Sequence, residues 1–251
     1  MIISLLLTTS LYINGINLNL NSAQIQKINT TYKIGKSIEV NGMNFAYTLP
    51  SIMGVESSFG KIIIGDQYSN GKLKSLYQSS LGPFQIRLET AKLVIQKTYL
   101  RKKYGYLIYK QNKKKLYEKY FKIKKKLVYY KSILQNISWK QRARKGNIKA
   151  IETLSWAKRR YKYNLKLSYK LSKKIYKDII LINLLLNNTK FSALIAGNYL
   201  KMLYIEAQKK GYKYPYFRAL GRYNGGWNNK KYARKVLKMM KLVKKIIKYK
   251  K

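Results

Sequence analysis

The chain has 251 residues, of which 54 are Lys or Arg and 8 are Asp or Glu, so its formal net charge is +46. Charge of this density favours polyanionic partners, whether nucleic acid, acidic lipid or an anionic cell-wall polymer. The hydrophobic fraction of 46% exceeds that of disordered chains and predicts a folded core. The sequence contains no Cys and no His, which excludes disulfides, a Cys nucleophile, a Ser-His-Asp triad and the usual zinc or haem ligand sets.

Acid–base chemistry in this chain must therefore use a small set of carboxylates, with Lys and Tyr as weaker candidates at neutral pH. These carboxylates are Glu39, Glu56, Asp66, Glu89, Glu118, Glu152, Asp178 and Glu206. The length predicts one large domain, or one domain with a substantial insertion, at roughly 100 to 200 residues per domain.

Residues 1–23 form an apolar N-terminal segment, with an apolar run from Ile2 to Ile13 followed by small or polar residues. The run is shorter than the stretch of about 20 residues that a transmembrane helix needs. Its length matches the core of a signal peptide, and Ser22-Ala23 could end a cleavage site, although no Lys or Arg precedes the run. A buried first strand or helix is the alternative interpretation, and we take export as the expectation.

The charge is unevenly distributed along the chain. Residues 1–60 contain three basic residues, whereas residues 97–178 contain 28 of the 54 and only three acids. Apolar residues recur in this basic segment at spacings of 3 and 4, as in a helix: Leu116, Tyr120, Ile123, Leu127, Tyr130, Leu134 and Ile137. A second apolar series follows Gly146-Asn147: Ile151, Leu154, Tyr161, Leu165, Ile175, Ile179 and Ile182. The pattern predicts an antiparallel helical hairpin that turns near residues 144–147.

Two interpretations of this basic arm remain open. Charge runs of this kind are usually solvated helix faces. The alternative is an arm that binds polyanions, such as the anionic polymers of a cell envelope. No RNA-type signature or base-stacking motif favours nucleic acid.

Glu56 stands out among the carboxylates. We expect Thr48 to cap a helix that has Pro50 in its first turn and Gly60 as its stop. Glu56 shares one face of this helix with Leu49, Ile52 and Met53. Burial of a carboxyl on such a face raises its pKa toward the range of a general acid, whereas a Glu at the edge of the face would simply point to water.

Four short motifs follow one another along the chain: Glu56-Ser57-Ser58-Phe59-Gly60, Gly82-Pro83-Phe84-Gln85-Ile86, Asn198-Tyr199-Leu200 and Arg222-Tyr223-Asn224-Gly225-Gly226. Their order resembles that of the soluble lytic transglycosylase family, which has a lysozyme-like fold. The resemblance covers about residues 45–96 and 184–243. Departures are Pro83-Phe84, where Leu-Met is common, and Arg222 and Gly225, where alanines are usual. None of them replaces the Glu, Gln, Tyr or Asn that the family uses.

The resemblance implies a mainly α protein in which residues 24–96 and 184–251 form a lysozyme-like domain and residues 97–183 form a basic helical insertion. It implies that Glu56 protonates the glycosidic oxygen between N-acetylmuramic acid and N-acetylglucosamine, then accepts a proton from the muramic 6-hydroxyl to give a 1,6-anhydro product. It assigns substrate-binding roles to Ser57, Gln85, Tyr223 and Asn224, with Tyr223 bonded near the Glu56 carboxylate. No metal or cofactor is required. The partner is then peptidoglycan, and the place of action is the bacterial wall, reached by export to the periplasm or with a phage.

Ordinary structural roles compete with each of these assignments. Gln85 could cap a turn, Asn224 could end a helix and Tyr223 could be a core aromatic residue. Asp66 offers a second mechanism, because a lysozyme-type hydrolase uses a second carboxylate beside its acid. The pairs Gly65-Asp66 and Asn70-Gly71 nevertheless favour a turn for this segment.

Two other classes of function remain. A basic nucleic-acid-binding protein would carry its charge on its recognition surface, yet the segments around Glu56 are among the least basic. A helical structural protein of a virion or cell envelope is the other alternative.

The C-terminal third is expected to be helical. Asn188 or Thr189 should cap a helix that runs to about Lys209. Pro215 should open a helix that leads into Tyr223. An amphipathic helix should follow from Tyr232, with 11 Lys or Arg among the last 22 residues, and its apolar stripe is expected to pack against the domain rather than disrupt a membrane.

Overall fold

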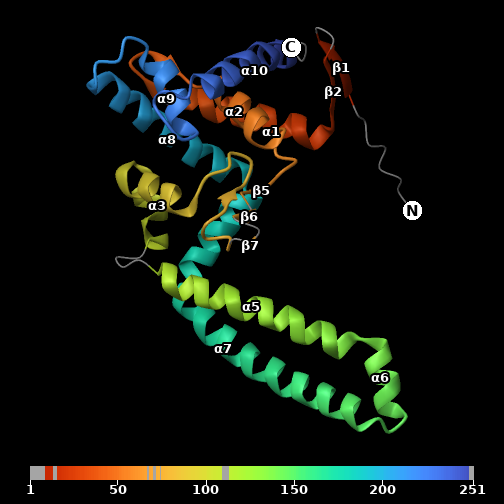
Figure 1. Cartoon of the computed structure of the whole chain (residues 1–251). Helices are drawn as coiled ribbons and strands as arrows, with labels where there is room; N and C mark the ends of the chain where they lie inside the picture. Colours follow the sequence, from red (N-terminus) through yellow and green to blue (C-terminus); the bar gives the residue numbers. More distant parts are fainter. Residues whose placement is uncertain are drawn as a thin grey trace. The chain divides into compact units, whose positions relative to one another are not determined.

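The computed structural model describes residues 9–13, 16–66, 68–69, 72–73, 75–108 and 113–248, and side chains are described from Leu20 onward outside 67–74 and 109–112 (Figure 1). Part of the expected apolar run, residues 2–8, therefore lies outside the described residues. The chain is mainly helical, which confirms the mainly α part of the expected fold class, and the lysozyme-like domain stays a prediction. It divides into two compact units, a larger unit of Met1–Tyr106 with Leu181–Lys251, and a hairpin unit of Leu107–Ile180.

Helices form most of the larger unit: α1 (Ser22–Ser37), α2 (Thr48–Ser57), α3 (Leu88–Lys97), α4 (Leu100–Tyr104), α8 (Thr189–Lys209), α9 (Pro215–Tyr223) and α10 (Lys230–Lys248). α1 packs on α2 and α8, while α10 packs on α2 and α9. The core between them is built from fully buried aliphatic side chains, among them Leu49, Ile52, Met53, Ile195 and Val236. α2 is therefore enclosed by helices from both ends of the chain, which fixes the position of the residues at its end.

The strands are short antiparallel pairs. β1 (Thr9–Ile13) pairs with β2 (Ile16–Leu20), Thr9 lying opposite Leu20. The remaining pairs are β3 (Glu39–Val40) with β4 (Met43–Asn44), β5 (Ile64–Gly65) with β8 (Ser80–Leu81), and β6 (Tyr68–Ser69) with β7 (Lys72–Leu73). The described part of the N-terminal apolar run is thus a strand, and export stays a prediction.

Side-chain caps begin several helices at the residues that the sequence suggests. The Asn188 side chain accepts a hydrogen bond of 2.9 Å from the backbone N–H of Phe191 and caps α8, as expected. Pro215 is the first residue of α9, also as expected. At α1, Asn21 and Gln24 bond reciprocally in a capping box.

The expected cap at Thr48 is wrong. Thr48 is already inside α2, and its hydroxyl lies 2.7 Å from that of Tyr216 on α9. Tyr47 holds the cap position without a side-chain hydrogen bond. The helix also ends earlier than the expected stop at Gly60, because Ser58 already adopts a left-handed conformation with φ of 50°.

The hairpin unit contains α5 (Lys114–Gln135), α6 (Ile137–Arg144) and most of α7 (Ile148–Asn187), and the short 3-10 helix η1 (Gly105–Leu107) leads into it. α5 and α7 run antiparallel (Figure 1). Ile123 and Leu127 of α5 pack with Leu171 of α7 in its small core. The expected hairpin is therefore present as a helical pair with its own apolar seam.

Two details of the hairpin differ from the prediction. The first helix is divided at Asn136, whose side chain caps α6 by accepting from the N–H of Trp139 at 3.1 Å. On α7, Ile151 and Leu165 of the expected seam are exposed, whereas Ala150 and Ala157 are fully buried. Small side chains thus form part of the inner face, because they leave room for the large residues of α5.

The basic insertion was expected at residues 97–183, and the compact unit observed there is shorter, at Leu107–Ile180. Residues 97–106 belong to the larger unit by contact. Leu100 is buried there, and the Tyr104 ring meets that of Phe191 edge to face at 4.9 Å. The basic composition therefore begins at Lys97, about ten residues before the hairpin unit itself begins. In α4 the basic side chains are exposed while Leu100 is buried in the larger unit.

No helix in the described part of the chain is by itself long and apolar enough to cross a membrane, in line with the expectation of no integral span. α7 and α8, which meet at a bend of 96°, pass the same criterion of length and composition only as a pair.

Candidate active site

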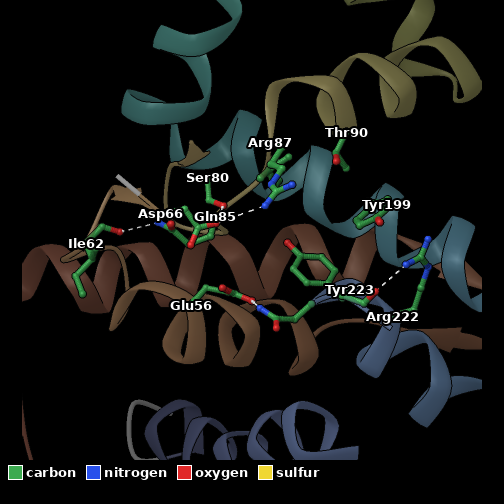
Figure 2. A pocket seen from close by; sticks show the side chains of 14 residues that line it. Glu56, Ile62, Asp66, Ser80, Gln85, Arg87, Thr90, Tyr199, Arg222 and Tyr223 are labelled. Atoms are coloured by element: carbon green, nitrogen blue, oxygen red, sulfur yellow. Dashed lines mark hydrogen bonds and ion pairs between the residues drawn. The ribbon is translucent and has the colours of Figure 1, made fainter. Parts of the chain in front are cut away.

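A cleft of about 670 Å³ lies in the larger unit and brings the four motifs together (Figure 2). It is lined by Glu56, Ile62, Gly65, Asp66, Ser80, Gln85, Ile86, Arg87, Thr90, Tyr199, Arg222, Tyr223, Asn224 and Gly225. Most of these side chains are polar and carry amide, hydroxyl or carboxylate groups. Four of the five expected site residues therefore share one cavity, and Ser57 does not line it.

Glu56 lies in the last turn of α2 and is partly buried. Its Oε1 accepts a hydrogen bond of 2.6 Å from the Tyr232 hydroxyl and one of 3.3 Å from Nδ2 of Asn224. Burial raises the pKa of the Glu56 carboxyl, the two hydrogen bonds partly oppose this, and the negative charge of Asp66 raises the pKa further. A carboxyl that keeps its proton above the usual range can serve as a general acid.

Tyr232, in the first turn of α10, is the site residue that the sequence did not indicate. It was expected only as the start of an amphipathic stripe, yet its hydroxyl makes the shorter bond to Glu56. Burial and the neighbouring Glu56 charge raise the pKa of Tyr232, so the phenol remains protonated and donates. A buried Tyr on an otherwise aliphatic helix face needs a hydrogen-bond partner for its hydroxyl. The position of Tyr232 on such a face was the one sequence feature that could have indicated its role.

Tyr223 closes the cleft from the end of α9. Its ring stacks on that of Tyr232 at 6.4 Å and 7°. Its hydroxyl donates to the backbone oxygen of Phe84 at 3.1 Å, rather than bonding at Glu56 as the resemblance implied. Tyr223 therefore ties α9 to the second motif, and the phenol at the carboxylate is that of Tyr232.

Asn224 follows α9 and is exposed toward the cleft. Its amide nitrogen donates to Glu56 while its backbone oxygen accepts from Nδ2 of Asn229 at 2.8 Å. Gly225, at φ of +115°, then turns the chain away. Asn224 thus has both a helix-ending role and a side chain directed to the acid.

Gln85 lines the cleft with its amide partly engaged in its own turn. Nε2 donates to the backbone oxygens of Gly82 at 2.9 Å and Ile62 at 3.2 Å. Its Oε1 lies so close to Gly65 that a Cβ there would approach to 1.9 Å. Gln85 is therefore a turn cap as well as a cleft residue, and Gly65 is the neighbour that leaves it room.

Ser57 joins two motifs beneath the cleft. Its buried hydroxyl donates to the backbone oxygen of Pro83 at 2.6 Å and accepts from the N–H of Gly60 at 2.8 Å. Gly82, beside this contact, has φ of +72°, and a Cβ there would lie 1.9 Å from the backbone oxygen of Leu185. The substrate-binding role expected for Ser57 is replaced by a structural one, since no cleft surface is left to it.

Asp66 lines the same cleft as Glu56 and sits at a turn with φ of 50°. It accepts a hydrogen bond of 3.0 Å from Ser80 and forms an ion pair of 3.7 Å with Arg87, both charged side chains being largely exposed. In Figure 2, Asp66, Ser80 and Gln85 gather in one part of the cleft. The left-handed φ of Asp66 agrees with the turn chemistry expected at Gly65-Asp66, whereas the pair Asn70-Gly71 lies outside the described residues. The Asp66 carboxylate lies at the cavity.

Within the described residues, no group of three or more acidic side chains could hold a metal ion. Comparisons with protein-family models, curated proteins and solved structures return no match for this chain. A functional conclusion therefore depends on the chain's own residues.

Proposed function

We propose that the chain is a peptidoglycan lytic transglycosylase whose larger unit is a lysozyme-like domain and which acts on the bacterial wall. The surroundings of Glu56 support this function most strongly. A single carboxyl with a raised pKa, held by Tyr232 and Asn224, faces a polar cleft. Each of the four motifs that resemble the family's contributes at least one residue to the lining of this cleft.

The proposed reaction needs one acid–base group. Glu56 donates its proton to the glycosidic oxygen as the bond from that oxygen to C1 of N-acetylmuramic acid breaks. The Glu56 carboxylate then takes the proton of the C6 hydroxyl, whose oxygen bonds to C1 and closes the 1,6-anhydro ring. The proton is returned to Glu56, and no water is consumed. A raised pKa suits both steps, because the group must first give and then regain a proton.

The lining of the cleft suits a polar glycan. Amide groups of Gln85 and Asn224, with the hydroxyl of Thr90, offer donors and acceptors to sugar hydroxyl and N-acetyl groups. Arg222 adds a cation at the rim that could meet the lactyl or peptide carboxylate of a muramic acid unit. The rings of Tyr199 and Tyr223 supply flat apolar surface for a sugar face.

A lysozyme-type hydrolase is the second candidate, because Asp66 lines the same cleft as Glu56. In that mechanism Asp66 would position water or stabilise the oxocarbenium charge. Its contacts with Ser80 and Arg87 favour a supporting role for Asp66 instead, since they already engage its carboxylate.

Mass analysis of muropeptides after digestion of purified peptidoglycan tests the proposal. We expect digestion by the native protein to give anhydro-muramic ends, each lighter by one water than a reducing end. The Glu56→Gln variant should give none. Reducing ends would identify the hydrolase, and intact glycan in both digests would overturn an enzymatic function. Circular dichroism of the variant shows that a loss of cleavage is not a loss of fold.

A further inference from the structure

The far end of the hairpin unit exposes apolar side chains that its own core does not use. We define the hairpin tip as residues 137–151, which comprise α6, the turn that follows it and the first residues of α7. Ile137 is 71% exposed, Ile148 is 72% exposed and Ile151 is 45% exposed. Three branched aliphatic residues are thus exposed within 15 positions of one short segment. Exposed apolar side chains gathered in this way can mark an interaction site.

The exposure is built into a defined turn. Asn136 caps α6, and the Asn147 side chain caps α7 by accepting from the N–H of Ala150 at 3.0 Å. Gly146, at φ of +79°, makes the left-handed turn between them. Ala150 is fully buried, so the tip has an inner side and the exposed isoleucines belong to its outer side. Each isoleucine lies at or just after a helix start that a cap fixes.

The same 15 residues are strongly basic. They contain Lys140, Arg142, Arg144, Lys145 and Lys149, and no Asp or Glu. All five cations are exposed in the structure, as the isoleucines are. The Arg142 guanidinium lies over the ring of Trp139 at 5.8 Å, which adds an aromatic residue to the group.

We infer that the hairpin tip docks on the surface of an anionic phospholipid bilayer. Isoleucine side chains would enter the boundary between headgroups and acyl chains, while Lys and Arg meet the headgroup phosphates. Long basic side chains reach outward from such a position and keep their charges in water. Trp is enriched at this boundary, which suits Trp139.

Other polyanions would bind the cations of the hairpin tip but not its apolar side chains. Nucleic acid or an anionic wall polymer would pair with the five cations but leave Ile137 and Ile148 in water. A second copy of the chain could cover the isoleucines, but it would bring five more cations against the first five. A bilayer with acidic headgroups provides both an apolar layer and a negative surface. The inference stands on the hairpin unit alone and does not depend on the proposed cleavage activity.

Sedimentation with lipid vesicles tests the apolar part of the inference. The full chain is mixed with vesicles of equal parts phosphatidylglycerol and phosphatidylcholine, or of phosphatidylcholine alone, at about 0.15 M salt. We expect binding to the anionic vesicles only. The double variant Ile137→Ser/Ile148→Ser should bind them at least roughly tenfold more weakly, because two apolar side chains no longer enter the lipid. Val128→Ser is the matched control, since Val128 is 70% exposed on α5 outside the tip.

A second pair of variants separates local from total charge. Arg142→Gln/Arg144→Gln/Lys145→Gln removes three cations from the tip, and Lys122→Gln/Lys124→Gln/Lys126→Gln removes three exposed cations from α5. The tip variant should lose markedly more affinity for anionic vesicles than the α5 variant. With Trp156→Phe/Trp227→Phe, the emission of Trp139 should shift to shorter wavelength on the vesicles and resist quenching by iodide.

Several results would overturn the inference. Equal vesicle binding by the Ile137→Ser/Ile148→Ser variant and the native chain would show that the isoleucines do not enter the lipid. Binding to duplex DNA or teichoic acid as tight as to vesicles, and unaffected by the isoleucine changes, would make the tip a general polyanion surface. Self-association in sedimentation velocity that the isoleucine changes abolish would assign the surface to a second copy. Circular dichroism of each variant verifies the helical content, which these exposed substitutions should leave intact.

Discussion

The hydroxyl of Tyr232 donates a hydrogen bond of 2.6 Å to the carboxylate of Glu56, across 176 positions of sequence. The bond can form because α10 packs directly on α2. The ring of the same Tyr232 stacks on that of Tyr223. The protonation of the candidate acid is therefore set partly by a helix at the other end of the chain.

Glu56→Gln should abolish wall lysis, because Gln keeps the shape and the hydrogen-bond acceptor of Glu but has no titratable proton. General acid–base groups contribute roughly 10²- to 10⁴-fold to rate, and a loss of that size is expected in turbidity clearing of purified walls. Asp66→Asn is the companion variant and should retain most activity. Equal losses in the two variants would favour paired carboxylates over a single acid.

Tyr232→Phe should move the alkaline limb of the pH profile of kcat/KM to higher pH. The hydrogen bond from Tyr232 lowers the pKa of Glu56 against the effect of burial, so its removal lets the pKa rise. A general acid must be protonated, and its activity is lost as pH rises through its pKa. Tyr216→Phe removes another buried phenol, bonded to Thr48 rather than Glu56, and should leave the limb in place. A shift to lower pH in Tyr232→Phe, or equal shifts in both variants, would contradict this account.

The stability of the native chain relative to Glu56→Gln should fall as pH rises. Because the folded pKa of Glu56 is raised, the folded state binds the proton more tightly than the unfolded state does. The resulting stabilisation is complete below the unfolded pKa of about 4.3 and is lost as pH climbs through the folded pKa. Urea unfolding of both proteins at a series of pH values measures the difference. A difference that grows with pH would mean that the folded pKa is depressed.

Gly82→Ala should destabilise the larger unit far more than Gly42→Ala. Both glycines have nearly the same positive φ, +72° and +73°, but only at Gly82 does a Cβ meet another atom, the backbone oxygen of Leu185 at 1.9 Å. The backbone cost at Gly42 is about 1–2 kcal/mol, and overpacking at Gly82 adds roughly 1–3 kcal/mol or more. Thermal unfolding compares the two variants. Equal losses of stability would show that the turn moves freely off Leu185.

The helix ends that local chemistry controls could be predicted from the sequence. Asn188 and Pro215 act within one turn of their own positions, so the bounds of α8 and α9 follow from them. Thr48 has the same capping chemistry, but a tertiary contact with Tyr216 takes its hydroxyl. Within the hairpin, the break at Asn136 was hidden because the apolar spacing continues through it to Ile137.

The candidate site was predictable where motifs are short and local. Glu56, Gln85 and Asn224 each lie at the cleft where their motifs suggested. Tyr232 was not predictable, since it is one of 25 tyrosines and its partner is far away in sequence. A search for helical periodicity follows the large apolar residues and passes over alanine. For this reason the buried face of α7 was assigned to Ile151 rather than to Ala150.

Glu56 is the second-last residue of α2, and the last turn of this helix holds no basic side chain. The aligned peptide dipoles of a helix place partial negative charge at its carboxyl end. Ionisation of Glu56 is therefore opposed by the helix that carries it, whatever ligand lies in the cleft. Proton retention is then a property of the scaffold itself, and a Lys introduced at Ser58 would act against it by neutralising the negative pole.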